Sequence, residues 1–131
     1  MPGHTKGHIC FHFYNEKLLF TGDTLFSLGC GRIFEGTYEQ MFSSLNKIKA
    51  MPLDTQIYCG HEYTLNNSKF CIKHDAENLS LKKKIHNIEM KLNNSLPTVP
   101  STLKEELDCN IFLRAKDVKT FSKLRDLKDN F

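Results

Sequence analysis

The chain has 131 residues, of which 18 are basic and 15 acidic, giving a net charge of +3. This length suits one ordinary domain, and the charge excess is far below that of typical nucleic-acid-binding domains. Apolar residues make up 40% of the chain and aromatic residues 11%, which is enough for a hydrophobic core and excludes a globally disordered protein.

Three further features bear on location and completeness. The apolar runs are short, so none is predicted to span a bilayer. The five cysteines are scattered and include no C-x-x-C pair, which is typical of reduced thiols, so we expect a cytoplasmic location. The chain opens on Met1-Pro2-Gly3-His4-Thr5, which reads like a functional loop, and we therefore expect a fragment of a longer protein.

The first part of the chain predicts strands and loops. Residues 9–14 and 17–21 alternate around a short turn and predict a β-hairpin. A loop rich in glycine follows over 22–36, and residues 56–59 predict a third strand. Between them, residues 37–40 have the spacing of a capping box that opens a helix ending before Pro52.

The part after about residue 65 predicts helices. Helical patterns cover residues 65–72 and 78–92, and a proline-bounded connector follows over 97–100. Ser101 with Glu105 predicts the start of a short helix, and Asp117 is placed to cap the last one. The order of elements therefore predicts an α/β (α+β) fold with strands first and helices after them.

Three residues beside predicted strands are candidate metal ligands. His4 precedes the first strand, Asp23 follows the second, and His61 follows the third, each next to a glycine. Histidine and aspartate in loops at strand ends are common ligands of zinc and iron, and an aspartate can bridge two metals. The alternative is that the histidines are surface residues and the aspartate a turn residue, and the spacing alone does not separate the two interpretations.

Other chemistry-bearing residues favour structural interpretations. His8 and His12 are expected to be partly buried strand residues, and Cys30 a packed thiol rather than a nucleophile. The lysine run at 82–84 is predicted to be a solvated helix face, so no nucleic-acid partner is expected. Arg125 and Lys128 share a helix face, where they either complement the helix dipole or hold an anionic ligand.

Five segments, taken together and in order, resemble glyoxalase II, the hydroxyacylglutathione hydrolases of the metallo-β-lactamase superfamily. They are Pro2-Gly3-His4-Thr5, Phe20-Thr21-Gly22-Asp23-Thr24-Leu25-Phe26, Gly29-Cys30-Gly31-Arg32, Tyr58-Cys59-Gly60-His61-Glu62-Tyr63-Thr64 and Pro97-Thr98-Val99-Pro100-Ser101-Thr102. The resemblance implies the C-terminal half of an αββα sandwich, here residues 1–64, followed by a helical glutathione-binding domain, here residues 65–131.

The resemblance also implies a reaction and its cofactors. In this family a metal-bound hydroxide hydrolyses the thioester S-lactoylglutathione to glutathione and lactate, using two divalent metals that can be zinc, iron or manganese. By position, His4 resembles a ligand of one metal, His61 a ligand of the other, and Asp23 the bridging carboxylate. No catalytic residue beyond these metal ligands is implied.

The same resemblance implies five substrate-binding residues. Arg32 and Tyr63 take the positions of glutathione contacts, and Arg125 with Lys128 match the pair that holds the glycine carboxylate. Phe34 stands where the family usually has tyrosine, which removes one hydroxyl and a hydrogen bond with a typical net value of about 1 kcal/mol.

One departure limits the functional prediction. The family's amino-terminal T-H-x-H-x-D-H motif, which supplies the remaining metal ligands, does not occur in this chain. We therefore predict a hydroxyacylglutathione hydrolase that is inactive without an amino-terminal half or partner chain, with one sheet face left apolar and uncovered. The alternative is a non-catalytic remnant, or a subunit of a split enzyme, that retains only binding of glutathione conjugates.

Overall fold

The computed structural model describes residues 1–5 and 7–131, and its main sheet has four strands in the order β1-β2-β5-β6. These strands are β1 (Phe11–Phe13), β2 (Leu18–Gly22), β5 (Gln56–Cys59) and β6 (Ser101–Thr102). The β1–β2 pair is the antiparallel hairpin that the sequence predicts, with Phe11 opposite Phe20. Strand β5 runs parallel to β2 and antiparallel to β6.

Two short strands lie within the segment that the sequence predicts as a glycine-rich loop. They are β3 (Leu25–Phe26) and β4 (Gly29–Cys30), which pair antiparallel as a separate two-stranded sheet. Strands of two residues are too short to show any periodicity, which is why the sequence pattern indicates only a loop.

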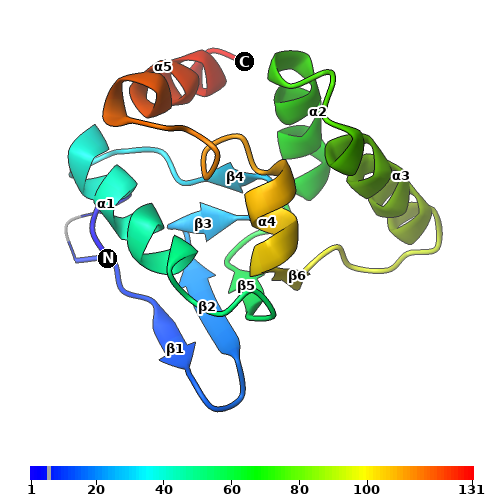
Figure 1. Ribbon diagram of the computed structural model, residues 1–131, viewed down its shortest axis with the longest axis horizontal. Helices are drawn as coiled ribbons and strands as arrows, with labels where there is room; N and C mark the ends of the chain where they lie inside the picture. The colour runs from blue at the N-terminus through cyan, green and yellow to red at the C-terminus, as the bar shows by residue number, and fades with distance from the viewer. Residues whose placement is uncertain (6) are drawn as a thin grey trace.

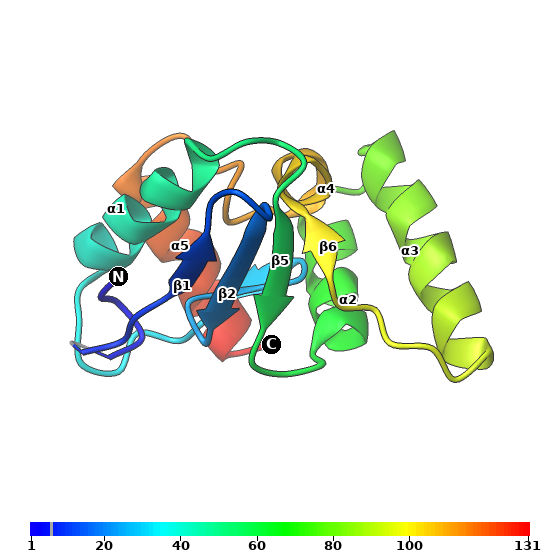
Figure 2. The same cartoon turned by 90° about the horizontal axis from the view of Figure 1, so that it is seen from below.

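The five helices of the described residues lie on one side of the main sheet. They are α1 (Tyr38–Lys49), α2 (Thr64–His74), α3 (Leu79–Asn93), α4 (Leu103–Cys109) and α5 (Val118–Asp129). In Figure 1, α1 and α5 lie together at one end of the molecule, while α2 and α3 lie at the other. Figure 2 shows the strands of the main sheet side by side in front of the helices. No described helix is both long and apolar enough to cross a membrane.

The helix starts follow local side-chain caps. Thr37 forms the predicted capping box with Gln40, and the Asp117 carboxylate accepts a hydrogen bond from the Thr120 amide at 2.8 Å. The predicted start at Ser101 is wrong, because Ser101 pairs with β5 and Thr102 caps α4 instead. Ser101 and Thr102 can both cap a helix, and only the position at which strand β6 ends decides which of them does so.

The lysine run also differs from its prediction in one position. Lys82 and Lys83 are exposed on α3, but Lys84 is buried and forms an ion pair with Glu105 of α4. Successive helical residues point in different directions, so one lysine of the three faces the neighbouring helix. The run is therefore only partly a solvated face.

The core lies between the main sheet and the helices. Leu19 and Ile57 are buried on the inner face of the sheet. The rings of Phe70, Phe112 and Phe121 form a continuous contact, with centroid distances of 5.9 and 6.0 Å. These rings come from α2, α5 and the segment between α4 and α5. They belong to the same buried cluster as Leu19 and Ile57, so residues on both sides of position 65 share one core.

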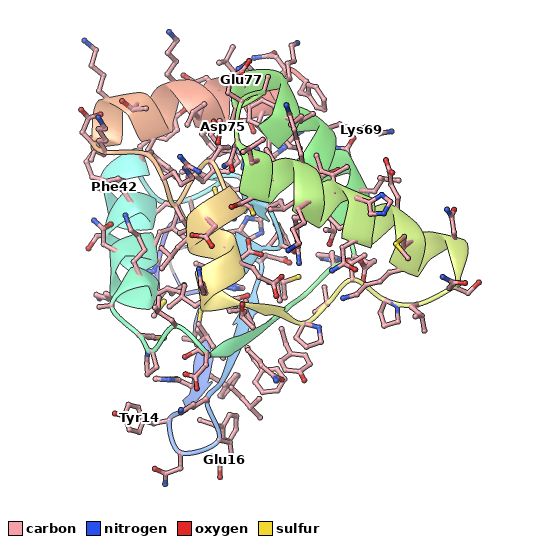
Figure 3. All side chains as sticks on the ribbon, turned by 45° about the vertical axis from the view of Figure 1, so that its right-hand side comes forward. Tyr14, Glu16, Phe42, Lys69, Asp75 and Glu77 are labelled. Carbon is pink, nitrogen blue, oxygen red and sulfur yellow. The ribbon has the colours of Figure 1, made fainter. Side chains whose placement is uncertain are left out.

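The outer face of the main sheet is apolar and has no described helix over it (Figure 2). Its exposed side chains include Phe11, Phe13 and Phe20, and the Phe20 ring stacks on Tyr58 at 5.0 Å. Figure 3 shows Tyr14 and Glu16 at the tip of the hairpin, away from the helices. The structure thus contains the uncovered apolar face that the resemblance implies.

Loss of an aromatic ring should have different effects in the core, on the helical side of the sheet, and on the uncovered outer face. Phe121 is fully buried, so Phe121→Ala should lower the free energy of unfolding by about 3–5 kcal/mol. Phe20 is 38% exposed, so Phe20→Ala should lower it by about 1 kcal/mol or less. Urea unfolding of both variants measures the difference, and equal losses would contradict a core placed only on the helical side.

Candidate metal and ligand site

Three loops meet at the end of the main sheet where strands β2 and β5 finish. Asp23 directly follows β2, and His61 follows β5 after one glycine. Because β2 and β5 are parallel neighbours, their carboxyl ends lie side by side, and the Gly60 amide donates to the Gly22 carbonyl at 2.7 Å. Binding residues often cluster at the carboxyl ends of parallel strands. His4 reaches the same place from the segment before the hairpin.

The Asp23 carboxylate lies between the two imidazoles. Its Oδ2 is 3.6 Å from Nε2 of His4, and its Oδ1 is 3.2 Å from Nε2 of His61. Each carboxylate oxygen therefore faces one ring nitrogen. This is the arrangement in which one carboxylate can be shared by two metals while each imidazole serves one of them.

The other nitrogen of His4 is already engaged. Nδ1 of His4 lies 2.7 Å from the Arg32 carbonyl oxygen. A carbonyl only accepts hydrogen bonds, so Nδ1 is the donor in this contact and Nε2 is the nitrogen that faces Asp23. A second hydrogen bond of this kind is the usual support of a metal-binding histidine. The His61 ring is instead held by stacking on Tyr63 at 4.9 Å.

Two glycines allow the loops to approach so closely. A Cβ atom on Gly31 would lie 1.9 Å from the Asp23 carbonyl oxygen, and one on Gly60 would lie 2.8 Å from Asp23 Oδ1. Only a residue without a side chain fits at Gly31, whereas a side chain at Gly60 would displace the Asp23 carboxylate. The glycines that the sequence shows as loop punctuation therefore have a packing role at the site.

His8 supports the Asp23 loop, a contact that sequence reasoning missed. The Asp23 amide donates to Nε2 of His8 at 3.1 Å. His8 precedes β1 and is partly buried, whereas His12 within β1 is exposed. Nothing in the sequence distinguishes the two histidines, because only the folded hairpin brings His8 under the loop.

Glu62 connects the His61 loop to the proline-bounded connector. Its carboxylate accepts hydrogen bonds from the amide and the hydroxyl of Thr98. Thr98 is buried and belongs to the segment that leads into β6. The segment at 97–102 thus lies next to the candidate ligand in the fold, although it is more than thirty residues away in sequence.

All eight predicted site residues line one cavity of about 440 Å³. This volume lies within the usual range of small-molecule sites. The predicted residues are His4, Asp23, Arg32, Phe34, His61, Tyr63, Arg125 and Lys128; Phe26, Cys30, Asn66 and Asn67 complete the lining. The structure brings the eight together, and their individual roles stay predictions.

Arg125 is more deeply buried than an exposed clamp would be. Its Nη1 donates to the Cys30 carbonyl at 2.5 Å, and its Nη2 donates to Asp129 at 2.9 Å. Only 4% of its side chain is exposed, although it lines the cavity wall. Burial of this guanidinium is tolerated because its donors are satisfied and Asp129 supplies the opposite charge.

Asp129 is a further residue that sequence reasoning missed. Its Oδ1 binds Arg125 and also lies 3.6 Å from Nε of Arg32, so it joins the two arginines of the wall. The spacing of four residues from Arg125 on α5 was an available signal. Lys128 is half-buried beside them, and its pKa is lowered by burial and by the charges of Arg125 and Arg32.

Cys30 behaves as the sequence predicts. It is buried, and this burial raises the pKa of its thiol even though Arg125 lies close by. A raised pKa keeps the sulfur protonated at neutral pH, which disfavours a nucleophilic role.

Comparison with known proteins finds two family profiles that match successive parts of the chain. The sequence profile of the hydroxyacylglutathione hydrolase C-terminus matches residues 62–131, and that of the metallo-β-lactamase superfamily matches residues 1–61. The chain belongs to the hydroxyacylglutathione hydrolase family. The resemblance to glyoxalase II is thereby confirmed, and membership of the metallo-β-lactamase superfamily implies divalent metal binding.

Two curated relatives show how much of the family the chain spans. It is 70% identical over 131 residues to a hydroxyacylglutathione hydrolase of Pelagibacter ubique, covering all of this chain and 55% of the relative. It is 51% identical over 128 residues to one of Prochlorococcus marinus, covering 97% of this chain and 52% of the relative. The chain thus spans about half the length of the curated relatives it matches.

A solved structure confirms the fold class. The crystal structure of BLEG-1 B3 metallo-β-lactamase superposes with a TM-score of 0.56 and 24% sequence identity, over 87% of this chain and 39% of that chain. At this identity the match establishes the α/β fold of the superfamily alone.

The described residues fit part of a two-metal ligand set. His4 and Asp23 Oδ2 can serve one metal, and His61 and Asp23 Oδ1 the other. Among the residues that the structure describes, no three His, Cys, Asp or Glu side chains converge on one metal position. Each metal would therefore have two ligands from this part of the chain, where a catalytic zinc normally has three.

The close contact at Gly31 gives a direct test of the loop packing. Gly31→Ala should lower the free energy of unfolding by about 1–3 kcal/mol, because the new methyl group overlaps the Asp23 carbonyl. Gly7→Ala is the matched control, since a Cβ there meets nothing within 4 Å and should change stability by no more than about 0.5 kcal/mol. Denaturant unfolding compares them, and similar values for both would refute the packing role of Gly31.

Proposed function

We propose that the chain is the metal- and glutathione-binding part of a hydroxyacylglutathione hydrolase, which hydrolyses S-lactoylglutathione to glutathione and lactate. The observation that supports this proposal is a single cavity lined by both the His4–Asp23–His61 group and the basic wall of Arg32 and Lys128. The names of the curated relatives support the same reaction.

The His–Asp–His group would hold the metals. When bound, divalent metals polarise a thioester carbonyl and activate water, which permits hydrolysis at neutral pH. The contribution of this chain is to fix the ligands: Arg32 orients His4 through its carbonyl, and Tyr63 holds His61 by stacking. Zinc is our first choice of metal because of the imidazole and carboxylate ligands, and iron or manganese would also fit them.

The basic wall would bind the ligand. Glutathione has two carboxylates, and the positive charges of Arg32, Arg125 and Lys128 favour an anion in this part of the cavity. The rings of Phe34 and Tyr63 provide apolar lining. In this proposal residues 1–64 supply the metal ligands together with Arg32, Phe34 and Tyr63, and residues 65–131 supply Arg125 and Lys128.

We further propose that turnover requires an amino-terminal polypeptide with the T-H-x-H-x-D-H motif. Two observations support this partner: each metal has only two ligands among the described residues, and the outer sheet face exposes Phe11, Phe13 and Phe20. A second β-sheet with an apolar face is the kind of surface that covers such a patch. We propose a cytoplasmic location, which the five unpaired cysteines support.

A second candidate function is binding of glutathione conjugates without catalysis. The incomplete ligand set favours it, because the basic wall is present without all the groups that metal chemistry needs. The two candidates differ in whether supplying the missing motif produces turnover.

The metal prediction concerns Asp23. Purified chain should bind Zn²⁺, and Asp23→Asn should abolish binding, because one residue contributes an oxygen to both positions. Competition with a metal indicator measures the affinity. Asp54→Asn is the control, since Asp54 is exposed and pairs only with Lys17 among the ion pairs of the described residues. Equal Zn²⁺ binding by wild type and Asp23→Asn would contradict the assigned site.

The same samples test the reaction. The chain alone should not hydrolyse S-lactoylglutathione, and addition of a polypeptide that carries the motif should produce turnover that Asp23→Asn removes. Turnover by the chain alone would contradict the need for a partner. Glutathione binding with no turnover under any of these conditions would favour the second candidate.

The ligand prediction concerns Lys128. Lys128→Ala should weaken glutathione binding by about tenfold, the value of one charge-assisted hydrogen bond. Lys123→Ala is the matched control, because Lys123 is an exposed lysine on the same helix that does not line the cavity. Isothermal titration calorimetry at fixed salt measures both, and equal weakening would refute a specific role for Lys128.

A further inference from the structure

The turn between β3 and β4 is held by side chains from distant helices. Glu106 of α4 accepts a hydrogen bond from the Leu28 amide at 2.8 Å. Asn110 at the end of α4 donates to the carbonyls of Phe26 at 3.3 Å and Gly29 at 3.1 Å. Glu106 and Asn110 are fully buried, so these bonds form away from water.

Helix α2 supplies two more hydrogen bonds to the same turn. Asn67 donates to the Ser27 carbonyl at 3.2 Å, and the Cys71 thiol donates to the Leu28 carbonyl at 3.2 Å. The Ser27 carbonyl and both the amide and the carbonyl of Leu28 are thus satisfied by side chains that lie forty or more residues away. Leu28 has φ +61°, an unusual value for a residue with a branched side chain, so the turn keeps this shape because its surroundings impose it.

Both ends of this turn lead to the candidate site. At its start, the Phe26 ring contacts the rings of His61 at 6.1 Å and Tyr63 at 5.1 Å. After its end, Gly31 packs on the Asp23 carbonyl. The next residue, Arg32, offers the carbonyl that receives Nδ1–H of His4. The turn therefore borders all three proposed metal ligands.

We propose that Glu106 and Asn110 are positioning residues for the metal ligands, acting through the β3–β4 turn. The inference rests on the proposed function and adds to it two residues that contact neither metal nor substrate. Glu106 fixes the turn at Leu28, and Asn110 fixes it at Phe26 and Gly29. Through this turn the helical part of the chain sets the orientation of His4 and His61.

Zn²⁺ affinity of the full chain tests the proposal. Glu106→Leu removes both oxygens while keeping a side chain of similar size, and it should weaken Zn²⁺ binding at least about tenfold, the typical effect of losing an outer support of a metal ligand. Glu106→Gln keeps the acceptor for the Leu28 amide and should bind Zn²⁺ like the wild type. A glutamate that only stabilised the fold would change the free energy of unfolding without changing the Zn²⁺ affinity of the folded chain.

A matched control separates positioning from general destabilisation. Ile88→Ala removes a buried side chain of α3 that makes none of the hydrogen bonds of the turn, and it should keep wild-type Zn²⁺ affinity in the folded state. If Glu106→Leu does not fold, Asn110→Ser takes its place, because it removes the donor to Phe26 and Gly29 but keeps an oxygen for the Phe112 amide.

The outcomes are distinct. Loss of affinity in Glu106→Leu or Asn110→Ser, with recovery in Glu106→Gln and none lost in Ile88→Ala, supports the proposal. Wild-type affinity in the folded Glu106→Leu or Asn110→Ser chain overturns it and leaves the proposed function intact. Absence of Zn²⁺ binding by the wild-type chain both alone and with a polypeptide that carries the T-H-x-H-x-D-H motif overturns the proposed function and the positioning role together.

Discussion

The candidate site depends on the close backbone approach of the loops that follow β2, β4 and β5. Gly31 packs directly against the Asp23 carbonyl, and Gly60 lies against the Asp23 carboxylate. A side chain at Gly31 would push the two backbones apart, and one at Gly60 would displace the Asp23 carboxylate from its place between the two imidazoles. The distances of 3.2 and 3.6 Å from Asp23 to His61 and His4 are a consequence of this packing.

The helical part of the chain completes this arrangement from outside. It does so with buried polar side chains, among them Glu106 at the β3–β4 turn and Arg125 at the Cys30 carbonyl. In the first contact the two residues are 78 positions apart in sequence, and in the second they are 95 positions apart. Buried polar groups are costly unless every one is paired, and here the pairing fixes one orientation of the helices on the sheet. The part that would bind ligand and the part that would bind metal are thus one packed body.

Two features of the molecule bear on the proposed amino-terminal partner. The outer face of the sheet presents aromatic rings to solvent, and the candidate metal ligands supply one imidazole and one carboxylate oxygen per metal. Both fit the proposed amino-terminal partner, because an apolar sheet face and a partial ligand set are each completed by a second polypeptide layer. One proposed interface would therefore both cover the exposed Phe20 ring and supply the remaining metal ligands.

Much of this protein was predictable from local sequence. The hairpin, the capping box at Thr37 and the cap at Asp117 depend on residues close together in the chain, so short-range patterns identify them. The motifs around His4, Asp23 and His61 also identified the family, and all eight predicted site residues line one cavity. By contrast, the two-residue strands and the choice of Thr102 over Ser101 as a cap depend on sheet pairing.

The contacts that orient the site came only from the tertiary structure. His8 under Asp23 and Glu106 at Leu28 show no distinguishing pattern in the sequence. The spacing of four residues between Arg125 and Asp129 indicates their pairing but not the further contact of Asp129 with Arg32. The parallel pairing of β2 and β5 brings Asp23 and His61 together, although 38 residues separate them in the chain. Sequence determines which chemical groups are available and which local elements form. Their distances and burial arise from long-range packing, which no local pattern encodes.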